Sequence, residues 1–136
     1  MIRKITDDAG GLLAIVVEEG FAKKDTNFVT PEDLPQQVGF LWREGGDSIE
    51  GHFHKDIKRD IKITQETLII LEGDVEVDLY DSSSTLVTTV RLKKGDLIVL
   101  VKGGHSFEFL SETKMVEVKQ GPYLGENDKV SFSNSS

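Results

Sequence analysis

The stretch ETLIILEGDVEVDLY, residues 66–80, decides the fold class of this chain. In its second half, Val75, Val77 and Leu79 alternate with polar or aromatic residues, and this period of two places them on one face of a strand. Its first half, Thr67–Leu71, is apolar at both parities, which predicts a strand covered on both faces by a second sheet or by a partner subunit. Gly73 marks the turn between the two halves.

Turn signals recur at strand-like intervals on both sides of this stretch. No window of 11 or more residues has a helical period, and the best helix candidate, Thr30–Leu34, is ended by Pro35. Many short strands with regular turns predict an all-β sandwich or barrel. We expect strands near residues 2–6, 11–18, 38–43, 49–54, 61–72, 74–80, 86–92, 96–101, 105–110 and 114–119.

The length of 136 residues predicts one domain, residues 1–136, with a core at about 36–119 and a polar C-terminal tail from about 131. The 24 acidic residues outnumber the 16 Lys and Arg, and the net charge of −8 argues against nucleic-acid and anionic-membrane binding. The absence of cysteine excludes disulfides and thiolate metal sites. The apolar runs are too short to span a membrane and the N-terminus lacks a signal-peptide core, so we expect a cytoplasmic protein.

Two histidines lie two positions apart in Gly51-His52-Phe53-His54. In a strand, residues i and i+2 point to the same face, which would place the two imidazoles about 7 Å apart. This spacing suits neighbouring positions around one metal ion.

Glu66 shares the parity of Leu68 and Ile70, so an inward-facing strand would hold its carboxylate in an apolar interior. A divalent cation is one way to keep such a group ionised, and a solvated position at the start of the strand is the alternative. His105 follows a glycine turn and begins a run that continues with Phe107 at the same parity. It could be a ligand, or a histidine of the core or surface.

Together these features resemble the cupins, whose first motif is a glycine, then His-x-His, then Glu-x6-Gly, and whose second places a histidine after a Gly-rich strand pair. The resemblance covers Gly46 to about Phe109 and implies a jelly-roll (double-stranded β-helix) barrel. It also implies one divalent metal ion inside the barrel. Fe, Mn, Co, Ni, Cu or Zn would suit the implied ligands, which are His52, His54, Glu66 and His105.

The chain departs from the cupin pattern in both motifs. Eleven residues, Lys55 to Gln65, separate the second histidine from the glutamate, where the family has three or four. Gln65 is the alternative to Glu66, at the opposite parity. In the second motif the gap from Gly103 to the histidine is one residue short, and a shifted register would give Ser106 the ligand position and leave three ligands.

The inserted segment is locally basic, with a net charge of +2 over residues 55–62. It could form a lid that attracts an anionic substrate such as a sugar phosphate, a nucleotide sugar or a carboxylate, or it could be a solvated hairpin. The candidate anion-binding residues are Lys55, Lys58, Arg59 and Lys62.

The layout TQE…GGH…EVKQGPY is similar to short cupins of bacterial surface-polysaccharide synthesis. The resemblance implies a small metal-binding cupin that binds or acts on an anionic small molecule, such as a sugar or nucleotide sugar. An isomerase- or epimerase-like reaction would use His52, Glu66 or His105 to move a proton beside a carbonyl. The alternatives are a non-catalytic ligand-binding or sensor cupin and a cupin whose metal is purely structural. Because open sheet edges and Thr67–Leu71 need cover, we expect a homodimer.

Overall fold

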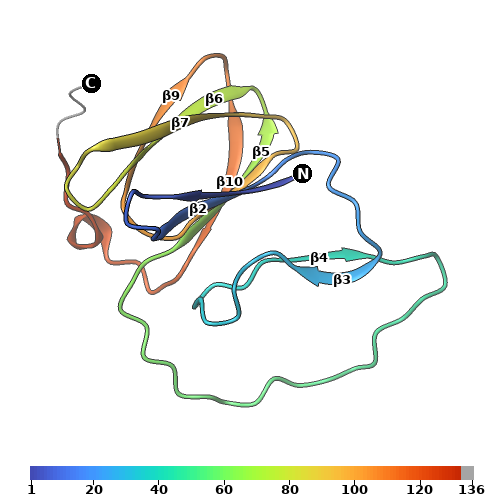
Figure 1. Cartoon of the computed structure of the whole chain (residues 1–136). Helices are drawn as coiled ribbons and strands as arrows, with labels where there is room; N and C mark the ends of the chain where they lie inside the picture. The colour runs from blue at the N-terminus through green and yellow to red at the C-terminus, as the bar shows by residue number, and fades with distance from the viewer. Residues whose placement is uncertain (133–136) are drawn as a thin grey trace.

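The computed structural model describes residues 1–132 and is all-β, with antiparallel strand pairs and one short 3-10 turn, η1 (Gly125–Asp128) (Figure 1). The polar tail expected from about residue 131 lies, for residues 133–136, outside the described residues. The strands are β1 (Ile2–Thr6), β2 (Leu12–Val17), β3 (Asp25–Phe28), β4 (Gly39–Trp42), β5 (Glu66–Glu72), β6 (Asp74–Tyr80), β7 (Leu86–Lys93), β8 (Leu97–Leu100), β9 (Gly104–Phe109) and β10 (Lys114–Lys119).

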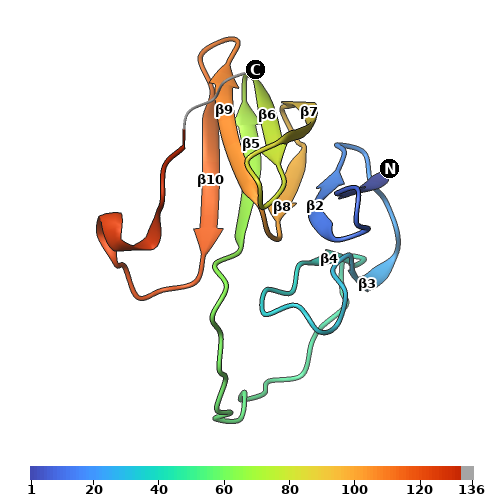
Figure 2. The same cartoon turned by 60° about the vertical axis from the view of Figure 1, so that its left-hand side comes forward.

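Two antiparallel sheets enclose the main core (Figure 2). The larger sheet has the order β1-β2-β8-β5-β10, and the smaller has the order β7-β6-β9. The alternating residues Val75, Val77 and Leu79 of β6 face inward, as their period predicts, and pack against Leu68 and Ile70 of β5. The chain of residues 66–80 therefore crosses from one sheet to the other, with Gly73 at the crossing.

A second layer covers the outer face of the larger sheet. Residues from the segment 21–40, among them Phe21 and Phe40 with their rings 5.0 Å apart, pack on this face. Ile69 of β5 contacts this layer, so the cover predicted for Thr67–Leu71 comes from the chain itself. Leu71 is the exception, because 47% of its surface stays exposed.

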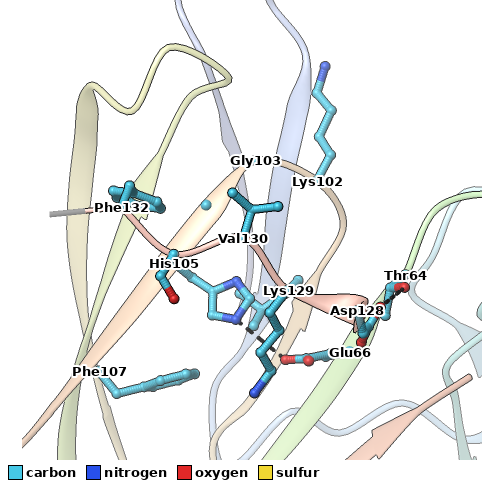
Figure 3. Close-up of a pocket in the computed structure, with 13 residues that line it drawn as sticks. Thr64, Glu66, Lys102, Gly103, His105, Phe107, Asp128, Lys129, Val130 and Phe132 are labelled. Carbon is cyan, nitrogen blue, oxygen red and sulfur yellow. Dashed lines mark hydrogen bonds and ion pairs between the residues drawn. The ribbon is translucent and has the colours of Figure 1, made fainter. Parts of the chain in front are cut away.

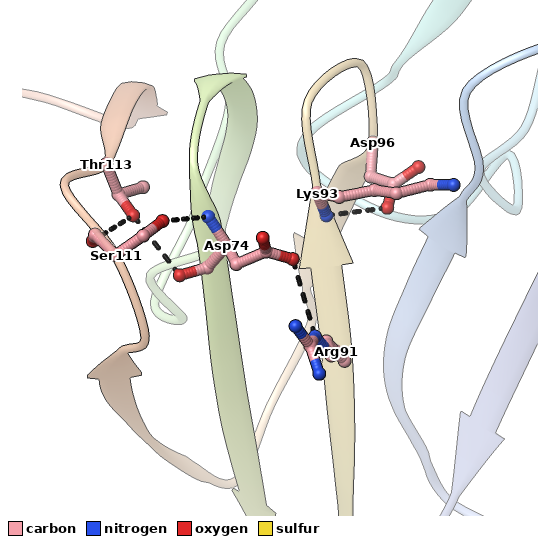
Figure 4. A network of polar contacts seen from close by, with 6 residues as sticks. All are labelled: Asp74, Arg91, Lys93, Asp96, Ser111 and Thr113. Carbon is pink, nitrogen blue, oxygen red and sulfur yellow. Dashed lines mark hydrogen bonds and ion pairs between the residues drawn. The ribbon is translucent and has the colours of Figure 1, made fainter.

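Polar contacts fasten the turns at one end of the two sheets (Figure 4). Asp96, only 3% exposed, accepts hydrogen bonds from the backbone N–H of Glu19 at 2.7 Å and of Lys93 at 2.8 Å. Nearby, the N–H of Asp74 donates to Ser111 Oγ at 3.0 Å. These bonds satisfy backbone groups that the strand ladders leave unpaired.

Two expectations about local structure are wrong, and one strand was missed. Residues 43–64, called the arm below, form neither strand nor helix and are exposed throughout, so the strand predicted near 49–54 does not form in the described chain. The sequence Thr30–Leu34 makes a turn, closed by a 3.2 Å bond from Leu34 N–H to the Pro31 carbonyl, and not a helix. Strand β3 was not expected, because its polar sequence DTNF has low strand propensity and forms through pairing with β4.

In the described residues, no helix has the length and apolar character needed to cross a membrane.

Candidate functional site

A cavity of about 480 Å³ opens between the two sheets, at the end where β5 begins and β8 ends (Figure 3). Asp96 and the backbone N–H groups of Glu19 and Lys93 that donate to it, called the Asp96 cluster below, lie at the opposite end of these two strands. The cavity, called the pocket below, is lined by β5, β8, β9 and the C-terminal segment 128–132. Its volume falls within the range of about 300–1,000 Å³ that small-molecule sites occupy.

Glu66 and His105 meet inside this pocket. Glu66 is the first residue of β5 and is 8% exposed, while His105 is the second residue of β9. His105 Nε2 lies 3.5 Å from Glu66 Oε2. Gly103, with a φ of 80°, makes the turn that brings the chain from β8 into β9. The sequence places Glu66 at the parity of Leu68 and Ile70 and leaves His105 open between a ligand, a core and a surface position, and the packing of the two sheets brings the two residues together.

The charge of Glu66 is stabilised by its surroundings. The His105 imidazole facing the carboxylate holds the pKa of Glu66 below its ordinary value through hydrogen bonding and, when protonated, through its charge. Burial of the carboxylate raises this pKa. Lys119, through its charge, and Glu117, through a side-chain hydrogen bond, lower it further. Glu66 is therefore an ionised carboxylate at neutral pH, oriented toward a histidine.

The rim of the pocket carries both lysines and hydrogen-bonding groups. Asp128 accepts a hydrogen bond from Thr64 Oγ1 at 3.0 Å, and its other oxygen lies 3.9 Å from Lys119 Nζ. Lys102 and Lys129 also line the pocket, and both are exposed. Lys102 Nζ lies 3.9 Å from Asp7 Oδ2 and points away from Glu66 and His105 in Figure 3, so Lys129 is the lining lysine that is placed to meet an incoming anion.

Aromatic rings form the remaining wall. The Phe107 ring lies edge-on to the His105 ring at 5.5 Å between centroids, which limits how the imidazole can turn. Phe132 packs against Tyr80 at 4.9 Å. Phe132 also lies so close to Gly104 that a Cβ there would come within 2.9 Å of its ring.

Gln65 and Ser106, the alternatives to Glu66 and His105, lie elsewhere. Gln65 is completely buried, where its Oε1 accepts from the N–H of Gln36 at 3.3 Å and its Nε2 donates to the Val101 carbonyl at 3.4 Å. Ser106 Oγ is 3.2 Å from Tyr80 Oη and does not line the pocket. Strand alternation explains both placements, because neighbours along a strand face opposite sides.

The structure divides the predicted metal ligands into two separate pairs. His52 and His54 lie on the exposed arm with their rings 5.2 Å apart, and His52 Nδ1 is 2.8 Å from the carbonyl of Glu50. Glu66 and His105 lie in the pocket. Among the described residues, no group of three or more His, Cys, Asp or Glu could hold a metal ion. The prediction of one divalent metal ion is therefore wrong, because the long segment after His54 carries the histidine pair away from Glu66.

The predicted anion-binding residues Lys55, Lys58, Arg59 and Lys62 are all exposed on the arm, and none of them lines the pocket. Arg59 and Lys62 instead border a separate hollow together with Glu32 and Asp33. Lys55 and Lys58 do not line this hollow.

Sequence reasoning missed the contribution of the C-terminal segment. Asp128, Lys129, Val130 and Phe132 line the pocket, although the sequence suggested no role for residues 128–130 and a polar tail from about residue 131. The apolar residues at alternating positions 130 and 132 were the available signal, since a solvated tail has no need for them.

Comparison of the chain with protein-family models, with curated proteins and with solved structures gives no match in any of the three.

Proposed function

We propose that the protein binds a small anionic molecule, of the sugar or nucleotide-sugar kind, in the pocket, and that the Glu66–His105 pair moves a proton on it. The observation that carries this proposal is the 3.5 Å approach of His105 Nε2 to a buried, ionised carboxylate. A carboxylate beside an imidazole orients the ring, which suits general acid–base chemistry. Proton transfer beside a carbonyl is the step shared by isomerases and epimerases.

The character of the rim supports an anionic ligand with hydroxyl groups. Lys129 supplies positive charge at the rim in a chain whose net charge is −8, and this charge attracts an anion to the pocket. Thr64 and Asp128 supply hydrogen-bonding oxygens of the kind that bind sugar hydroxyls. Phe107 and Phe132 offer apolar faces for a sugar ring or a base.

The proposal also includes the type of all-β fold. We infer a cupin-type jelly roll, and the support is that two antiparallel sheets enclose one core with the candidate site at one end between them. A jelly roll of this kind is a common host for small-molecule sites, although a fold by itself does not define a reaction.

Binding can be tested by thermal shift and calorimetry on the full chain with a panel of sugar nucleotides, using UDP-glucose as the reference probe. We expect at least one member of the panel to raise the melting temperature, since a ligand that binds only the folded state stabilises it. Proton transfer can be tested with a keto sugar nucleotide in D₂O, by following deuterium entry beside the carbonyl by NMR.

The matched variants are His105→Gln and Ser106→Ala, neighbours in β9 of which only His105 lines the pocket. We expect H105Q to abolish deuterium exchange and S106A to retain it. Binding without exchange would identify a non-catalytic ligand-binding protein. No stabilisation by any sugar nucleotide at millimolar concentration would overturn the proposed ligand class.

A further inference from the structure

A second cavity lies beside the pocket and shares a boundary with it. This cavity, of about 330 Å³ and called the side cavity below, is enclosed by the C-terminal end of the arm, the end of β10 and the turn that follows β10. Thr64 and Asp128 line both cavities, so the 3.0 Å hydrogen bond from Thr64 Oγ1 to Asp128 lies at their boundary (Figure 3). A ligand that extends past this hydrogen bond reaches from the Glu66–His105 pair into the side cavity.

The two cavities differ in charge. The pocket is lined by two carboxylates and two lysines, and one of the carboxylates is the ionised Glu66. The charged side chains that line the side cavity are Lys62, Lys119 and Asp128, two cations against one anion, which leaves a net charge of +1. A phosphate inside the pocket would lie beside Glu66, whereas in the side cavity it would meet an excess of positive charge. The side cavity is therefore the better place for the anionic group of a ligand.

Lys119 supplies a cation close to both cavities. It is the last residue of β10, its side chain is only 26% exposed, and its Nζ lies 3.9 Å from Asp128 Oδ2. This distance is too long for a hydrogen bond, so the ion pair leaves the N–H groups of the ammonium available. The charge of Lys119 also lowers the pKa of Glu66, which places the ammonium within electrostatic reach of the pocket. A partly buried ammonium with free donors is well suited to hold a phosphate.

An exposed aromatic ring stands at the rim of the side cavity. Tyr123 lines this cavity with 88% of its surface exposed, and Ile61, Ile63 and Leu124 add exposed apolar surface around it. A cavity that held only a phosphate would have no use for such a wall. Nucleobases stack on aromatic side chains whatever their identity, because every base has a flat face. The combination of lysines and an available ring therefore favours a nucleotide over a bare phosphate group.

We propose that the side cavity binds the nucleoside diphosphate part of a nucleotide sugar, with the phosphates at Lys62 and Lys119, the base against Tyr123, and the sugar in the pocket. This inference rests on the proposed function and narrows its ligand class. A sugar phosphate would occupy the pocket and leave Tyr123 without a contact.

The test is calorimetry on the full chain with UDP, UDP-glucose and glucose 1-phosphate, and with ADP, GDP, CDP and dTDP in place of UDP. We expect at least one nucleoside diphosphate to bind without the sugar, and its sugar nucleotide to bind at least about tenfold more tightly than glucose 1-phosphate. Tyr123→Ala should weaken binding of the nucleoside diphosphate about fivefold or more, the size of effect that loss of base stacking produces. Glu66→Gln changes only the pocket and should leave this affinity within about twofold.

Two matched variants control for indirect effects. Tyr123→Phe keeps the ring and should retain most of the affinity that Tyr123→Ala loses. Lys119→Gln should weaken binding, whereas Lys114→Gln, which changes an exposed lysine at the other end of β10, should not. If no nucleoside diphosphate binds at millimolar concentration, or if Y123A binds it as tightly as the wild type does, the side cavity is not a nucleotide site.

The outcomes separate this inference from the proposed function. A nucleoside diphosphate that binds in a Tyr123-dependent way, without deuterium exchange in any keto sugar nucleotide, would support the nucleotide site and contradict proton transfer by the Glu66–His105 pair. Deuterium exchange in a keto sugar phosphate, with no affinity for nucleoside diphosphates, would support the proposed chemistry and refute the nucleotide site.

Discussion

His105 Nε2 lies 3.5 Å from Glu66 Oε2, across the space between two sheets (Figure 3). One residue comes from the start of β5 and the other from β9, and these strands do not pair with each other. The pair is the one place among the described residues where a buried carboxylate faces an imidazole, and the chemistry proposed for the protein depends on it.

Acid should destabilise the protein partly through Glu66. Its folded-state pKa is lowered, chiefly by His105, so the stability that the ionised carboxylate contributes is complete above the unfolded-state pKa and is lost as the pH falls through the folded-state pKa. We expect Glu66→Gln to show a smaller loss of unfolding free energy between about pH 5 and pH 3 than the wild type. Urea titrations across that range would measure it, and an equal slope in both proteins would contradict the role given to the pair.

The rim lysine Lys129 should contribute to the affinity for an anion. Replacing Lys129 by Ala should weaken UDP-glucose binding about two- to fivefold, because an exposed cation contributes less than about 1 kcal/mol. The salt dependence of the affinity should also become flatter. Calorimetry at two ionic strengths provides the measurement. Lys94→Ala, an exposed lysine at the far turn, is the control, and a similar loss in K94A would show that overall charge decides the affinity.

Asp96 should be important for stability and not for the pocket. Asp96→Ala removes an acceptor for two backbone N–H groups in a buried position, and we expect a loss of about 2–4 kcal/mol in unfolding free energy. Asp8→Ala changes an exposed turn residue and should cost less than about 0.5 kcal/mol. Chemical denaturation compares the two variants, and equal costs would show that the Asp96 cluster does not hold this end of the sheets together.

Gly73 should tolerate no side chain at the turn between β5 and β6. Its φ is 99°, and an added Cβ would collide with the Glu112 carbonyl and with Thr113. We expect Gly73→Ala to cost about 2–4 kcal/mol, since backbone strain and steric overlap add. Gly20 has a φ of 89° with open space around it, so Gly20→Ala isolates the conformational cost, which is about 1 kcal/mol. Thermal unfolding of both variants separates the cost of backbone strain from the cost of steric overlap. Equal decreases in melting temperature would mean that the steric overlap at Gly73 is relieved at no cost.

The alternating residues of β6 and the turn at Gly73 could be predicted from the sequence, because a period of two and a positive-φ glycine are local properties. The same parity rule separated Glu66 from Gln65 before the structure placed one in the pocket and the other under the outer layer. Strand β3 could not be found this way, since its polar sequence forms a strand only beside β4.

By itself, the sequence determined that the chain is all-β, that it is acidic and free of cysteine, and which face of β6 points inward. Only the tertiary structure decided that Glu66 meets His105, that His52 and His54 stay apart from them, and that residues 128–132 complete the pocket. The physical reason is that side-chain parity is set within a strand, whereas the neighbours of a strand are set by distant segments competing for the same edges. The arm illustrates this limit, because a strand was expected near residues 49–54 but, in the described chain, no sheet edge lies beside that segment to pair with its backbone.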